Sequence, residues 1–154
     1  MIFHRDFAYV PHFGEGEKAA NSYLMSVVAI LAGMPLPVVN FLATLFFYLG
    51  NRRSTYFVRW HCTQALLAQL LLFVVNVAAI SWAISVIFGD AAFTNTFIAY
   101  LITAVLVNMT ELSMTVYSAI QVNKRRHVEW IVFGDLAHQF CRPDSELNTE
   151  ESTI

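Results

Sequence analysis

The chain has 154 residues, of which 57% are hydrophobic and only 13% are charged, with a formal net charge of −2. Soluble domains usually carry about a quarter of their residues as Asp, Glu, Lys and Arg. None of these four residue types occurs from 19 to 51, from 60 to 89 or from 91 to 110. Apolar runs of this length indicate membrane spans. The basic residues flank these runs instead of forming a face with interleaved aromatic residues, which excludes a nucleic-acid partner.

Residues 1–16 precede the first apolar run, and charges and aromatic residues stand where a cleavable signal would have its apolar stretch. We expect this segment to lie at the membrane interface through its apolar residues, which are Ile2, Phe3, Phe7, Tyr9 and Phe13. A four-helix transmembrane domain is expected to follow at residues 17–123.

The first apolar run is interrupted by one glycine and two prolines between residues 33 and 37. Proline removes a backbone donor and disfavours helical geometry in the residue before it. The pattern therefore predicts a hairpin, with helices at residues 18–33 and 36–50. The alternative is one kinked span over residues 19–49, which would place all later residues on the opposite side of the membrane.

A polar loop at residues 51–55 is expected to end in a helix cap at Ser54 or Thr55. The next helix is predicted at residues 57–88, which is too long for the bilayer alone. Its beginning, near Tyr56, Arg59 and Trp60, has the aromatic and basic composition of a membrane interface. A turn at Gly89 and Asp90 leads to a fourth helix at residues 95–121.

The basic cluster Lys124, Arg125 and Arg126 opens a juxtamembrane segment at residues 124–143. An amphipathic helix on the inner leaflet is expected over residues 128–140. Its predicted apolar face consists of Val128, Ile131, Val132, Leu136 and Phe140. Residues 144–154 are acidic and polar, which predicts a disordered tail.

Lys and Arg in short loops mark the cytoplasmic side of a membrane protein. Arg52, Arg53 and Arg59 lie between the second and third predicted helices, and a second basic cluster follows the fourth. The other two turns contain no Lys or Arg. The sequence therefore predicts a multi-pass membrane protein with both termini in the cytoplasm.

Glu111 lies 13 residues inside the fourth predicted helix, counted from Lys124. A carboxylate at that depth costs a few kcal/mol, so it must be protonated, paired or in contact with a polar cavity. It shares one helix face with Asn108, Thr115 and Ser118. Equal depth in the other helices predicts one buried polar layer, made of Asn40, Gln69, Asn76, Asn108 and Glu111. The layer either lines a hydrophilic path or joins the helices through hydrogen bonds, and the second interpretation is favoured because amides usually serve that purpose.

No catalytic or nucleotide-binding motif occurs, which predicts a protein that is not an enzyme and has no cofactor. The five histidines show no metal-ligand spacing, so no metal site is expected; they are His4, His12, His61, His127 and His138. The lipid bilayer is the expected partner, together with a homo-oligomer or a larger membrane complex.

The stretch from Glu17 to Phe73 resembles a family of small bacterial four-helix membrane proteins related to the channel subunit of the chloroplast inner-envelope import translocon, the Tic complex. Leu36-Pro37, the turn at residues 51–54 and the run from Tyr56 to Leu66 carry the resemblance. It implies four helices with cytoplasmic termini, a location in the bacterial inner membrane and a role in protein import. It also singles out Arg59, His61 and Gln64 as an interfacial motif of unknown role. The alternative is that these residues only anchor the helix at the interface or bond a neighbouring helix.

Two functions remain open at this point, and the resemblance favours the first. One is a translocon-like or channel-like component through which proteins or solutes pass, which requires a hydrated cavity at Glu111. The other is a non-transporting accessory or assembly subunit of a larger membrane complex, which requires a tightly packed bundle. Four short helices cannot enclose a wide pore, so transport would require oligomerisation.

Overall fold

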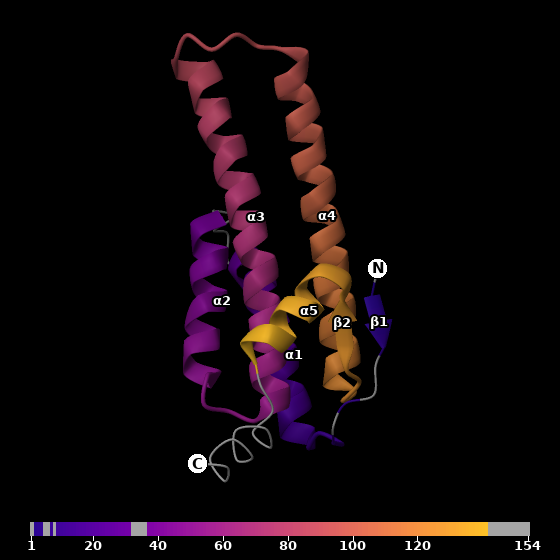
Figure 1. Cartoon of the computed structure of the whole chain (residues 1–154). Coiled ribbons are helices and arrows are strands. Elements are labelled where there is room, and N and C mark those ends of the chain that lie inside the picture. Colours follow the sequence, from indigo (N-terminus) through magenta and orange to yellow (C-terminus); the bar gives the residue numbers. More distant parts are fainter. Residues whose placement is uncertain (1, 5–6, 8, 32–36, 142–154) are drawn as a thin grey trace, which may run out of the picture.

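The computed structural model describes residues 2–4, 7, 9–31 and 37–141. The fold is all-α, a four-helix bundle with an additional C-terminal helix and a two-stranded sheet (Figure 1). In chain order the elements are β1 (Ile2–His4), α1 (Phe13–Leu31), α2 (Pro37–Asn51), α3 (Tyr56–Phe88), α4 (Asn95–Asn123), β2 (Val128–Trp130) and α5 (Ile131–Phe140).

Helices α1 and α2 are separate and pack against each other and against α3. This arrangement agrees with a hairpin and not with one kinked span. Helix α1 begins at Phe13, five residues before the expected start, while α2 opens on Pro37, whose missing N–H is not needed in the first turn. The turn expected at residues 33–36 lies outside the described residues.

Helices α3 and α4 are the described helices that are long and apolar enough to cross a membrane, and α2 is a shorter apolar helix. Helix α3 has 33 residues and α2 has 15, which correspond to about 50 Å and 22 Å at ~1.5 Å per residue. The far halves of α3 and α4 therefore extend beyond the α1–α2 pair (Figure 1). Thr55 is the N-cap of α3 but its side chain makes no cap bond, whereas the Thr94 hydroxyl of α4 accepts from the Phe97 N–H.

The chain reverses after α4 through Arg125, whose φ of 63° lies in the left-handed region. It then enters β2, which pairs antiparallel with β1 so that Ile2 lies opposite Trp130. The expected helix over residues 128–140 is therefore wrong in its first three residues. Helical periodicity did not reveal the strand because its partner lies more than a hundred residues earlier in the chain.

The basic end of the bundle is the end that carries Arg52, Arg53 and residues 124–126. A core of apolar residues lies there, where α1, α3, α4 and β2 meet. Ile2 and Phe7 pack against this core, and the Phe7 ring stacks on Tyr56 with centroids 5.2 Å apart. This part of the N-terminal segment thus covers the protein core instead of only lying at the membrane interface. Gly16 permits the close approach of α1 to α4, because a Cβ there would lie 3.0 Å from the Val122 carbonyl oxygen.

Helix α5 crosses α3 and buries its small residues Gly134 and Ala137. Val132 and Phe140 of the predicted apolar face are 63% and 70% exposed, whereas Val128 of that face is fully buried in the strand. The expected amphipathic helix is therefore limited to the ten residues of α5. Gly134 on its inner face allows α5 to approach Glu129 of β2 closely.

Candidate functional site

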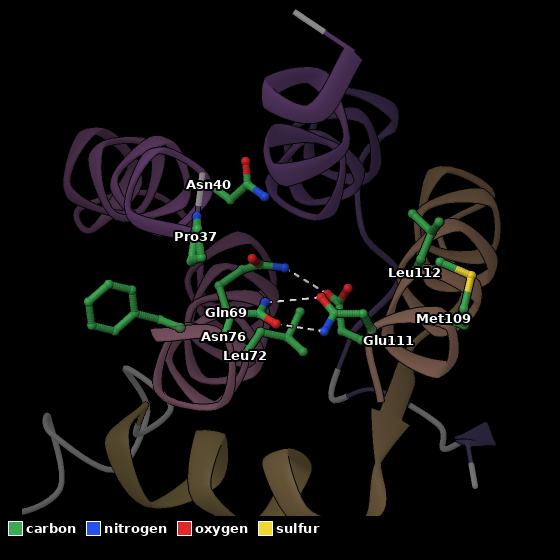
Figure 2. A pocket seen from close by; sticks show the side chains of 10 residues that line it. Pro37, Asn40, Gln69, Leu72, Asn76, Met109, Glu111 and Leu112 are labelled. Atoms are coloured by element: carbon green, nitrogen blue, oxygen red, sulfur yellow. Dashed lines mark hydrogen bonds between the residues drawn. The ribbon is translucent and has the colours of Figure 1, made fainter. Parts of the chain in front are cut away.

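The five residues of the predicted polar layer line one cavity of about 160 Å³ between α2, α3 and α4. Figure 2 shows Gln69 of α3 and Glu111 of α4 pointing toward each other, with Asn40 on the α2 side. Pro37, at the start of α2, lines the same cavity. The layer therefore lies at the level where the α1–α2 hairpin ends, partway along α3 and α4.

Most polar atoms of the layer bind one another. The Gln69 amide donates to Glu111 Oε1 at 2.7 Å, and the Thr115 hydroxyl donates to the same oxygen at 2.7 Å. Two turns further along α3 and one turn further along α4, Asn76 and Asn108 exchange two amide hydrogen bonds of 3.0 and 2.8 Å (Figure 2). Each of these bonds except that of Thr115 joins α3 to α4.

Asn40 does not take part in these bonds. Its Oδ1 atom is buried and has no hydrogen-bond partner among the described residues. A cavity of this size with polar walls has room for water molecules. The arrangement can thus hold a small amount of water while the other four residues fasten α3 to α4.

The motif Arg59, His61 and Gln64 is not an interfacial motif as a whole. His61 and Gln64 are fully buried, and Arg59 is half-buried. The Gln64 amide donates to the Tyr23 hydroxyl of α1 and to the Val128 carbonyl, and its oxygen accepts from the Trp130 N–H. Gln64 therefore joins α1, α3 and β2, which matches the alternative of a bond to a neighbouring helix.

His61 belongs to a continuous chain of hydrogen bonds. Its Nδ1 is 2.8 Å from the Tyr23 hydroxyl, and its Nε2 is 3.2 Å from His127 Nδ1. His127 Nε2 is in turn 2.9 Å from Glu129 Oε1. Each imidazole directs one ring nitrogen at each of its two neighbours. One set of tautomers therefore satisfies every hydrogen bond from Tyr23 to Glu129.

A third histidine completes this chain from α5. His138 Nε2 lies 3.0 Å from Glu129 Oε1, and the Trp60 indole N–H donates to His138 Nδ1 at 3.3 Å. Burial raises the pKa of Glu129, but the hydrogen bonds from His138 and His127 outweigh this effect, and the pKa lies below its usual value. Glu129 is therefore an ionised carboxylate between two imidazoles.

This His127–Glu129–His138 group is a set of potential metal ligands that the sequence analysis did not anticipate. Sequence spacing could not reveal it, because His138 reaches Glu129 only when α5 folds back over β2. Gly134 contributes to this fit, since a Cβ at that position would lie 3.2 Å from the Glu129 Cβ. The sequence shows only the order of these residues, with Glu129 and Gly134 between His127 and His138.

A family model described as the magnetosome magnetite crystal formation protein family matches residues 19–134. The chain belongs to this family. The matched part runs from α1 through all of α4 and β2 into α5, so it includes the polar layer and Glu129. Membership in this magnetosome family, together with the two long apolar helices, indicates a membrane location for the chain.

Comparisons with curated proteins and with solved structures return no match. The family that matches is thus the magnetosome family, and the resemblance to the chloroplast import translocon has no support from these comparisons.

Proposed function

We propose that the protein is an accessory or assembly component of the magnetosome membrane that acts in magnetite crystal formation. The observation that carries this proposal is the family match, which extends over residues 19–134 and so over most of the helical bundle. A family defined by crystal formation favours the accessory function over protein import. The remaining functional question is whether the bundle also conducts a solute.

The geometry of the polar layer favours a structural function for it. Gln69, Glu111, Asn76 and Asn108 direct their polar atoms at one another across α3 and α4. Interhelical bonds of this kind stabilise membrane bundles by about 0.6–2 kcal/mol each. A conducting path would instead need polar groups directed at a continuous column of water along the bundle.

The proposed orientation places both chain termini in the cytoplasm. Arg52, Arg53, Lys124, Arg125 and Arg126 are all exposed at one end of the bundle. Basic residues near helix ends favour the cytoplasmic side. Because α1 and α2 form a hairpin, this orientation holds whether the hairpin crosses the whole bilayer or only part of it.

The function is tested by deleting the gene in a magnetite-forming bacterium and measuring crystal size and number by electron microscopy. We expect smaller or fewer crystals, full rescue by the wild-type gene, and location of a tagged copy in the magnetosome membrane. Crystals of normal size and number in the deletion strain would contradict the proposal.

The channel alternative is tested by thiol labelling in a background that lacks Cys62 and Cys141. Single cysteines replace Asn108 and Glu111, and Asn123→Cys provides an exposed control. We expect a membrane-impermeant reagent to label position 123 and to leave positions 108 and 111 unlabelled. Labelling at all three positions would support a water-filled path and the channel function.

A further inference from the structure

The group formed by His127, Glu129 and His138 lies outside the polar layer, at the basic end of the molecule. His127 immediately precedes β2, Glu129 lies within it, and His138 comes from the last turns of α5. Three different local structures therefore direct one ligand atom each at a common point. The proposed accessory function leaves this arrangement unexplained.

Two distances within the group match those between adjacent ligands of a bound metal ion. Glu129 Oε1 lies 2.9 Å from His127 Nε2 and 3.0 Å from His138 Nε2. All three ligand atoms lie within 4.8 Å of one another. Adjacent ligands of an octahedral ion with bonds of ~2.1 Å are about 3 Å apart, so a small displacement of these side chains admits an ion.

Burial and access also suit an ion that enters from water. The side chain of His127 is 2% exposed and that of Glu129 is 10% exposed, whereas that of His138 is 38% exposed. Two ligands are therefore fixed inside the protein and the third forms the entrance. The ring of His127 is held from behind by His61, which is itself bound to Tyr23. Such outer contacts orient metal-binding histidines.

Trp60 connects the site to a measurable signal. Its N–H donates to His138 Nδ1, so in this arrangement His138 carries its proton on Nε2. An ion bound at Nε2 displaces that proton, and Nδ1 must then carry one and can no longer accept from Trp60. The Trp60 ring also lies against His127 with centroids 4.4 Å apart. Metal binding must therefore change the surroundings of this indole.

We propose that His127, Glu129 and His138 bind one divalent transition-metal ion, and that the ion in the cell is iron(II). Two imidazoles and one carboxylate with further positions open to water are a typical ligand set for non-haem iron(II). The choice of iron rests on the family, whose mineral is an iron oxide. The existence of the site rests only on the side-chain geometry and does not depend on the proposed accessory function.

The first test is an anaerobic titration of the full chain with iron(II), in detergent micelles and without a histidine tag. We expect one ion to bind per chain. His138→Ala and Glu129→Gln should each weaken binding about tenfold or more, because each removes or weakens a ligand. His12→Ala is the matched control, since His12 is an exposed histidine outside the group. Absence of saturable binding, or equal binding by His138→Ala and the wild type, would overturn the proposal.

A second measurement separates lost ligation from lost folding. Cobalt(II), a paramagnetic stand-in for iron(II), should quench the fluorescence of the wild-type protein through Trp60 and leave His138→Ala largely unquenched. His138→Cys, which restores a ligand atom, should recover most of the binding and the quenching. Far-UV circular dichroism must be unchanged in both variants. Saturable cobalt binding without quenching would place the ion elsewhere and would likewise overturn the assignment.

Discussion

The two ends of the α3–α4 pair are built in opposite ways. At the basic end, Trp60, His61 and Gln64 are fully buried beneath α1, β2 and α5. At the far end, Ile87, Phe88 and Phe93 are 69%, 84% and 70% exposed. Polar side chains thus lie inside at one end, while large apolar side chains lie outside at the other.

This difference shows where each end obtains its stability. The basic end has its own core and its own network of buried hydrogen bonds, as a water-soluble domain does. The far end has a few aromatic contacts, such as Trp82 with Phe97 and Tyr100, and must cover its apolar surface with lipid or a partner. The polar layer lies between the two regions, so substitutions along α3 and α4 should lose effect away from the basic end.

The largest effect is expected for Gln64→Leu. The change leaves the Tyr23 hydroxyl, the Val128 carbonyl and the Trp130 N–H without their Gln64 partner. Leaving a buried polar group unsatisfied costs about 1–3 kcal/mol, so we expect a loss of about 3 kcal/mol or more in unfolding free energy. Reversible unfolding in mixed micelles measures it. Gln139→Leu, at an exposed position of α5, is the control, and a similar loss there would refute the argument.

A smaller effect is expected in the polar layer for Glu111→Leu. This change removes the acceptor shared by Gln69 and Thr115 and should cost about 1–2 kcal/mol. Glu111→Gln keeps an oxygen at the same place and should cost less than about 0.5 kcal/mol. The same unfolding assay compares the two variants. If Glu111→Gln lowered the unfolding free energy as much as Glu111→Leu, the charge itself would matter. That result would contradict the proposed structural function of the layer.

The pair Asn76 and Asn108 should show a coupling that is smaller still. Their two amide bonds join α3 to α4, and such pairs in membrane proteins are worth about 0.6–1.7 kcal/mol. A double-mutant cycle with leucine at each position isolates this term. Additive effects of the two single changes would show that the reciprocal bonds do not hold α3 and α4 together.

The two regions also differ in how much of their structure the sequence predicts. Apolar runs and flanking charges predicted α2, α3 and α4 to within a few residues, because hydropathy acts locally along the chain. Counting depth from the basic residues placed Asn40, Gln69 and Glu111 at one level, and the structure brings them around one cavity. Helices that cross a bilayer have little freedom to shift, and this makes depth predictable.

The basic end was predicted less well because its contacts are long-range. The residues near Val128 in the sequence do not predict that β2 pairs with β1. The residues near His61 likewise do not predict its hydrogen bonds to Tyr23 and His127. The aromatic and basic composition there resembled an interfacial anchor, which has no buried partners. The fold instead covers these residues with β1, β2 and α5, and so converts an apparent surface into a core.

The last and smallest effect concerns Glu129 and pH, measured with metal chelated. The pKa of Glu129 in the folded protein lies below 4.5, its unfolded value, because the histidine hydrogen bonds outweigh the effect of burial. A lowered pKa adds stability that is present above about pH 4.5 and is lost as the pH falls through the folded value. We expect wild type to be more stable than Glu129→Gln at pH 6, and this difference to shrink below pH ~4.5, where the protonated carboxyl resembles the amide. A difference that stays constant down to pH ~3 would show that the carboxylate gains nothing from its histidines. Glu129 would then contribute to the stability of the basic end through packing alone.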